Sequence, residues 1–191
     1  PTWDCFLKVK PADCRRIFVL GGSTAAGFPY ERNLRFSRLL ECSLQQAFPD
    51  QLIEVVNLAM SAVNSYTLLD FMDELLVQQP DIILLYAGHN EYYGALGVAS
   101  RESLGRRRVW VMTALQLRRT RTYLLVRDAV NAVRQWGHEP VTPQNVTLME
   151  RVVGRQEIPL DGSLYRAGIS QFEKNLHAML SKAQKKGVPL I

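Results

Sequence analysis

The stretch Asp81-Ile-Ile-Leu-Leu-Tyr86 is an uninterrupted apolar run that lies between Pro80 and a glycine-containing turn. A short apolar run with these flanking residues is typical of a β-strand that is buried on both faces. Two similar runs precede it in the chain, at residues 16–20 and 53–57. Strands of this kind form parallel sheets that are covered by helices on both sides.

Helical patterns separate these predicted strands. Apolar residues recur at helical spacing over residues 36–48, and Pro49 ends that segment. A second helical pattern covers residues 66–79, with Pro80 directly beyond its end. The alternation of strand and helix is the βαβ pattern, so the sequence predicts an α/β fold of three layers, with a parallel sheet between two layers of helices.

The regular alternation breaks after Gly97. Residues 98–160 contain an Arg-rich stretch, a predicted helix at 122–136 and a turn-rich run, and we expect an Arg-rich helical insertion there in a single domain of residues 1–191. A long helix is predicted for about residues 164–186, with Gly187 at its C′ position. Residues 188–191 have the pattern of another buried strand, so we expect the domain to be incomplete at its C-terminal end.

The composition is that of an ordinary globular domain. Hydrophobic residues make up 47% of the 191 residues and charged residues 21%, which excludes an intrinsically disordered chain. The net charge of +5 arises in one segment, because the stretch from Arg101 to Arg127 holds eight arginines and a single acid, Glu102. The cysteines number three and have no metal-ligand spacing, so reduced, structural thiols are expected.

Chemically useful residues follow each predicted strand. Ser23 lies in the glycine-rich turn after the first strand, residues 57–64 follow the second, and His89 and Asn90 follow the third. Ligands of open parallel sheets bind beyond the carboxyl ends of the strands, so we expect these segments to meet. A hydroxyl nucleophile, free backbone N–H groups and a side-chain amide are what acyl transfer needs. Asn57 and Asn64 are expected to satisfy backbone groups of the loops.

Other interpretations of the glycine-rich turn are possible. It lacks the Lys-Ser/Thr pair of a P-loop and the three-glycine spacing of dinucleotide-binding turns, which disfavours a phosphate site. It also does not match the Gly-x-Ser-x-Gly pattern of a nucleophile elbow, because the serine does not have a Gly both two residues before it and two residues after it. A purely structural turn, with Ser23 as a helix cap, remains an alternative.

The three segments taken together resemble the sequence blocks of the SGNH, or GDSL-like, hydrolase family. Residues 17–30 are similar to the first block, with Ser23 at the nucleophile position. Residues 56–62 are similar to the second block. Residues 88–91 are similar to the third block, Gly-x-Asn-Asp, with Asn90 at the oxyanion-hole position. The run Gly-His-Asn-Glu-Tyr-Tyr-Gly is most similar to bacterial domains that often accompany tetratricopeptide repeats.

The resemblance implies a flavodoxin-like α/β/α fold and a serine esterase, or lipase-like hydrolase of acyl esters. Ser23 would attack the carbonyl carbon, while the N–H groups of Ser23 and Ala62 and the side chain of Asn90 would hold the oxyanion. Ala62 stands where the family has glycine, and Glu91 stands in place of Asp. The family's fourth block, Asp-x-x-His, which supplies the base, is missing from the chain. We therefore expect the chain alone to be inactive, and no metal or organic cofactor is implied.

The expected partner is a small ester or another O-acylated substrate. The alternative is a non-catalytic domain that binds carbohydrate or a protein partner on the same scaffold. The missing catalytic base and the replacement of the family's glycine by Ala62 both favour this alternative. The stretch from Arg101 to Arg127 interleaves basic and apolar residues, which predicts contact with an anionic membrane surface or an acidic partner, unless it forms a solvated helical pair. It contains no recognisable nucleic-acid-binding module, so nucleic acid is not an expected partner. The sequence indicates no cellular compartment.

Overall fold

The computed structural model describes residues 5–30, 32–100, 103, 108–135 and 157–191. Its sheet consists of the parallel strands β1 (Cys14–Gly21), β2 (Leu52–Asn57) and β3 (Ile82–Tyr86), in the order β2-β1-β3. Leu190 pairs in parallel with Ile83, so the C-terminal residues extend the sheet beyond β3. The predicted α/β class with a parallel sheet is confirmed, and the strand order is that of a flavodoxin-like sheet.

The helices lie close to their predicted positions. The helices predicted for residues 36–48, 66–79 and 164–186 are α2 (Phe36–Ala47), α3 (Ser65–Val77) and α7 (Ser163–Lys185). Gly187 adopts the left-handed conformation expected after α7, with φ of 66°. The remaining helical elements are α1 (Ser23–Ala26), the 3₁₀ turn η1 (Arg32–Leu34), α4 (Arg108–Arg118) and α5 (Arg121–Gln135).

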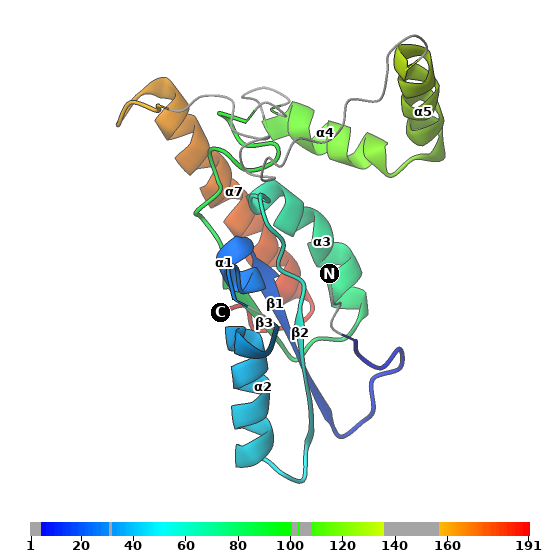
Figure 1. The fold of residues 1–191 in the computed structure, drawn as a ribbon, viewed down its shortest axis with the longest axis vertical. Coiled ribbons are helices and arrows are strands. Elements are labelled where there is room, and N and C mark those ends of the chain that lie inside the picture. The colour runs from blue at the N-terminus through cyan, green and yellow to red at the C-terminus, as the bar shows by residue number, and fades with distance from the viewer. Residues whose placement is uncertain (1–4, 31, 101–102, 104–107, 136–156) are drawn as a thin grey trace.

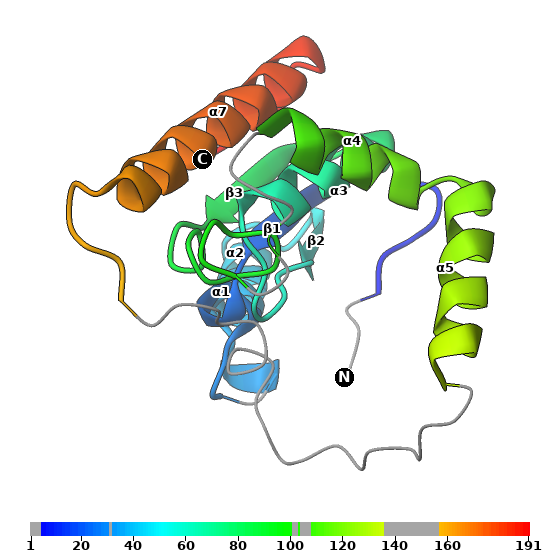
Figure 2. The same ribbon diagram turned by 90° about the horizontal axis from the view of Figure 1, so that it is seen from above.

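Alternate residues of β1 face opposite helical layers. Phe18 and Leu20 belong to a core cluster with side chains of α3 and α7, whereas Ile17 and Val19 belong to a second cluster with Ala25 of α1. Figure 2 shows α3 and α7 on one side of the sheet and α1 and α2 on the other. Burial on both faces explains why this strand has no polar alternation in its sequence. The predicted three-layer arrangement is therefore confirmed.

The Arg-rich stretch contributes α4 and α5. Arg119 fastens the end of α4 to α3, because its guanidinium donates to the carbonyl oxygen of Asp70 at 2.7 Å and to its carboxylate at 2.9 Å. In Figure 1, α5 projects away from the sheet. The helix predicted for residues 122–136 corresponds to α5, and Trp136 lies outside the described residues. The predicted insertion of residues 98–160 includes further residues outside the described ranges, and its boundaries stay a prediction.

Cys5, Cys14 and Cys42 form no disulfide in the part of the chain that the structure describes. Burial raises the pKa of the Cys14 thiol to about 11, with a contribution from the neighbouring Glu54, so this side chain stays in the thiol form at neutral pH. In the described part of the chain, no helix has both the length and the apolar character that crossing a bilayer requires.

Candidate functional site

The segments that follow the strands meet at one edge of the sheet. Gly21, the last residue of β1, pairs with Tyr86, the last residue of β3. The segment after β2 is tied to the same place, because the N–H of Met60 donates to the carbonyl oxygen of Gly21 at 3.1 Å. The strand order reverses between β1 and β3, which is where open α/β sheets bind ligands. The predicted convergence is confirmed.

Two glycines allow a very close approach between the first and third segments. A Cβ atom on Gly21 would lie only 2.3 Å from the carbonyl oxygen of Tyr86. A Cβ atom on Gly22 would lie 3.0 Å from Nδ2 of Asn90. The absence of side chains at these positions therefore places the Asn90 amide directly over the turn that carries Ser23.

Ser23 is the first residue of α1 and is half-buried. Gly22 occupies the N-cap position, and no side chain caps this helix. Ser23 is therefore not the cap of this helix, and the interpretation of the segment as a purely structural turn stays an alternative. Gly27 ends the helix in the left-handed conformation, with φ of 94°, and the N–H of Phe28 donates to the carbonyl oxygen of Ser23 at 3.0 Å. This short, tightly closed turn presents Ser23 at the end of β1.

Ala62 lies in the second segment and adopts a left-handed backbone, with φ of 61°. Its carbonyl oxygen accepts a hydrogen bond from the N–H of Ala95 at 2.7 Å. The N–H of Ala62 donates to no backbone acceptor among the described residues. A residue with a Cβ pays a steric cost of roughly 1–2 kcal/mol in this conformation, which is the physical reason for a glycine at this position of the resembled block.

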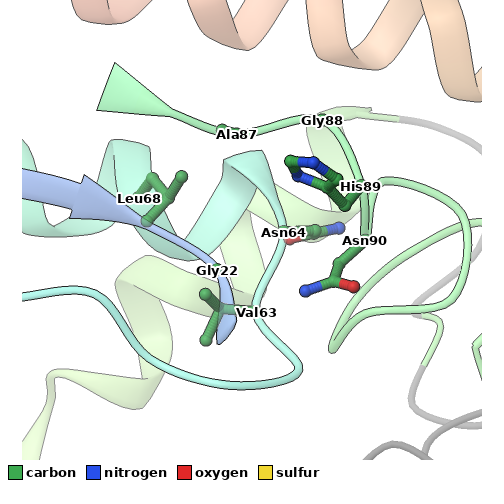
Figure 3. Close-up of a pocket in the computed structure, with 8 residues that line it drawn as sticks. All are labelled: Gly22, Val63, Asn64, Leu68, Ala87, Gly88, His89 and Asn90. Carbon is green, nitrogen blue, oxygen red and sulfur yellow. The ribbon is translucent and has the colours of Figure 1, made fainter. Parts of the chain in front are cut away.

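A small pocket lies where the three segments meet (Figure 3). Its empty volume is about 200 Å³, a figure that includes open solvent. Its lining residues are Gly22, Val63, Asn64, Leu68, Ala87, Gly88, His89 and Asn90. Ser23 and Ala62 each directly adjoin a lining residue.

The two asparagines of the second segment hold the loops, as predicted. Nδ2 of Asn57 donates to the carbonyl oxygen of Ala25 at 2.8 Å, and its Oδ1 accepts from the N–H of Ala59 at 2.9 Å. Asn64 is the N-cap of α3, and its Oδ1 accepts from the N–H of Tyr66 at 3.1 Å. The first contact fixes α1 against the end of β2, and the second fixes the start of α3.

Glu91 begins a buried polar network behind the pocket. Its carboxylate accepts from the hydroxyl of Ser65 at 2.7 Å and from the Ser65 N–H at 3.1 Å. Nδ2 of Asn175 donates to Oγ of Ser65 at 2.9 Å, and Arg108 donates to Oδ1 of Asn175 at 3.0 Å. Burial raises the pKa of Glu91, although the bonds from Ser65 act in the opposite direction. Glu91 thus ties the Asn90 turn to α3.

This network was not anticipated from the sequence. Its one visible signal is in α7, where the polar residues Gln171 and Asn175 occupy the stripe that otherwise buries Leu164, Met179 and Ala183. A polar residue in a buried stripe needs a hydrogen-bond partner. The periodicity of α7 shows that Asn175 is buried, but it does not identify Ser65 as the partner.

Among the described residues, no hydrogen bond joins Ser23 to a histidine. His89 is exposed and lies edge-on against the Tyr86 ring, with centroids 4.9 Å apart. His177 is exposed on α7, and His138 lies outside the described residues. The described residues also contain no group of three or more His, Cys, Asp or Glu side chains placed to hold a metal ion.

No protein-family model matches the chain, and no curated protein matches it in sequence. It is similar in structure to TesA, with 16% identity, 92% of this chain and 58% of that chain covered, and a TM-score of 0.47. It is similar to AlinE4, an SGNH-hydrolase family esterase, with 15% identity, 93% and 75% covered, and a TM-score of 0.40.

An acetyl xylan esterase from Geobacillus stearothermophilus is also similar, with 12% identity, 97% of this chain and 78% of that chain covered, and a TM-score of 0.42. This chain thus spans less than two thirds of the length of the TesA structure. The similar solved structures also include a lipase/acylhydrolase from Enterococcus faecalis and a GDSL-like lipase from Parabacteroides merdae, and the likeness is one of fold.

Proposed function

We propose that the chain carries the nucleophile and the oxyanion hole of an SGNH-type serine esterase that hydrolyses small esters. The observation that carries this proposal is the position of Asn90. Its amide nitrogen lies over Gly22, so close that a Cβ atom on Gly22 would come within 3.0 Å of it, and Ser23 is the next residue. A hydroxyl nucleophile and a neutral hydrogen-bond donor therefore stand at the same turn, as attack on an ester carbonyl requires.

The reaction begins with attack of Ser23 Oγ on the carbonyl carbon. Negative charge then develops on the carbonyl oxygen, and three donors bind it: the N–H groups of Ser23 and Ala62 and Nδ2 of Asn90. The left-handed turn leaves the Ala62 N–H without a backbone acceptor among the described residues. Donors that are already oriented stabilise this charge without reorganisation, and one such donor contributes roughly 10²–10³ in kcat.

The proton of Ser23 Oγ needs a base, which in this proposal is a histidine from an Asp-x-x-His segment beyond residue 191. Loss of the base in a serine hydrolase costs on the order of 10⁶ in kcat, so the chain of 191 residues alone is expected to be almost inactive.

The test compares p-nitrophenyl acetate turnover by the 191-residue chain and by a longer protein that includes the next strand and helix. We expect turnover in the longer protein only, and its loss in Ser23→Ala. The matched control is Ser61→Ala, because Ser61 is an exposed serine in the second segment. Turnover that survives Ser23→Ala would refute the assignment of the nucleophile.

A non-catalytic domain that binds carbohydrate or a protein partner is the second candidate. The strained Ala62, in a position that suits glycine, favours it, because a scaffold freed from catalysis tolerates such a substitution. This candidate predicts that the longer protein lacks Ser23-dependent turnover of any small p-nitrophenyl ester. Ser23-dependent turnover would exclude it.

A further inference from the structure

Asn64 presents an unused hydrogen-bond donor in the pocket. The side chain is only 3% exposed, and its Nδ2 has no hydrogen-bond partner among the described residues. Its orientation is set by the opposite end of the amide, because Oδ1 accepts from the N–H of Tyr66 at 3.1 Å. Figure 3 shows Asn64 beside His89 and Asn90, within the group of residues that line the pocket.

A buried donor without an acceptor is costly, by roughly 1–3 kcal/mol, so a molecule in the pocket that brings an acceptor is favoured. The lining residues include no carboxylate that could accept from Asn64. Glu91, the acid that directly follows the lining residue Asn90, is engaged by the hydroxyl and the N–H of Ser65. The acceptor must therefore come from the occupant of the pocket.

Under the proposed function of the site, the part of the substrate that occupies the pocket beside Asn64 is its acyl group. The carbonyl oxygen already receives three donors in that mechanism. The leaving group has to depart to solvent, whereas the pocket is walled on one side by the buried side chains of Val63 and Leu68. The acyl group stays attached to Ser23 and is the group that remains beside these walls.

We propose that Asn64 is a specificity-determining residue whose amide donates to a second oxygen in the acyl group of the substrate. The site then prefers short acyl groups with an ether or hydroxyl oxygen close to the carbonyl over all-carbon acyl groups of equal size. A site built to bind such an oxygen disfavours the analogue that lacks it, because the protein donor is left unpaired.

The test uses p-nitrophenyl methoxyacetate and p-nitrophenyl butyrate, whose acyl groups differ by an oxygen in place of a methylene. The measured quantity is the ratio of their kcat/KM values in the longer protein. In Asn64→Ser the ratio is expected to fall about tenfold, the size of one hydrogen bond of about 1.4 kcal/mol. The intrinsic reactivity of the two esters cancels when wild type and variant are compared.

The variants separate the donor from the helix cap. Serine is about as good an N-cap as asparagine, so Asn64→Ser is expected to keep α3 while it removes the amide. Asn64→Asp keeps both the shape and the cap but replaces the donor with an acceptor, and its ratio should fall at least as far. An unchanged ratio in both variants, with turnover that still depends on Ser23, would overturn the role of Asn64 and leave the proposed esterase intact.

A binding measurement gives an answer even if no Ser23-dependent turnover is found and the proposed function fails. The side-chain amide resonances of Asn64 in ¹⁵N-labelled protein are identified by their absence in Asn64→Ser. We expect methoxyacetate to shift these resonances and butyrate to leave them in place. Equal shifts, or none, would overturn the inference.

Discussion

The contact between Gly22 and Asn90 makes Gly22→Ala an informative substitution. The backbone at Gly22 has φ of −87° and ψ of −160°, which alanine adopts without strain. The new Cβ would lie 3.0 Å from Nδ2 of Asn90 and 3.9 Å from its Cγ. An ordinary contact begins at about 3.4 Å, so the amide has to move by a few tenths of an ångström.

The expected loss of activity follows from this displacement. A misplacement of about 1 Å in a catalytic geometry costs on the order of 10² in rate, so a shift of a few tenths predicts a loss in kcat of up to about tenfold. Removal of the amide in Asn90→Ala is expected to cost more, roughly 10²–10³ in kcat with little change in KM. The free energy of unfolding should change little in Gly22→Ala, because only one side chain has to move.

The assay is a double-mutant cycle on the longer protein, with kcat for p-nitrophenyl acetate as the readout. In the Asn90→Ala background the new methyl group no longer meets an amide, so Gly22→Ala should add little further loss. Thr24→Ala, an exposed change in the same turn, serves as the control and should leave kcat unaltered. Equal losses from Gly22→Ala in both backgrounds would refute the reasoning, because the methyl group would then act on something other than Asn90.

Three other properties of the molecule lead to predictions. Ala62→Gly should raise the free energy of unfolding, measured by urea titration, by about 0.5–1 kcal/mol. The reason is that the relief of left-handed strain exceeds the conformational entropy that glycine adds to the unfolded chain. A destabilised variant would contradict the left-handed backbone at Ala62. Burial raises the pKa of Glu91 on folding, so its contribution to stability is full below its unfolded pKa and is lost as the pH rises through the folded value. The stability of wild type relative to Glu91→Gln should therefore decline as the pH rises above the ordinary pKa of a glutamate, about 4.3, and a difference independent of pH would show that Glu91 titrates normally. We also propose that the stretch from Arg101 to Arg127 meets anionic membranes. Exposed Arg118 and Arg121 should then drive co-sedimentation with anionic vesicles at 0.1 M but not 1 M salt, since the Debye length falls from about 10 Å to about 3 Å. Arg118→Ser with Arg121→Ser should weaken that binding, and binding that ignores salt and both arginines would remove the membrane proposal.

Local sequence determined the strands and helices because burial leaves a direct pattern. The apolar run of β3 and the helical spacing in α2, α3 and α7 were sufficient to place these elements within a few residues. The meeting of Ser23 and Asn90 at one edge also followed from sequence, since the carboxyl ends of parallel strands lie side by side. The bounds of α4 could not be predicted in this way, because its packing partners, including Tyr66 of α3, come from elsewhere in the chain.

Tertiary structure alone decided which donors are free and which are used. From the sequence, Asn64 is expected to satisfy backbone groups of its loop, and only the structure shows that it caps α3 and that its amide nitrogen is buried without a partner among the described residues. Ser65 lies 110 positions from Asn175, with which it shares a hydrogen bond, and 26 from Glu91. Hydrogen bonds depend on distance and angle between groups that the chain brings together only on folding, so no local pattern encodes them.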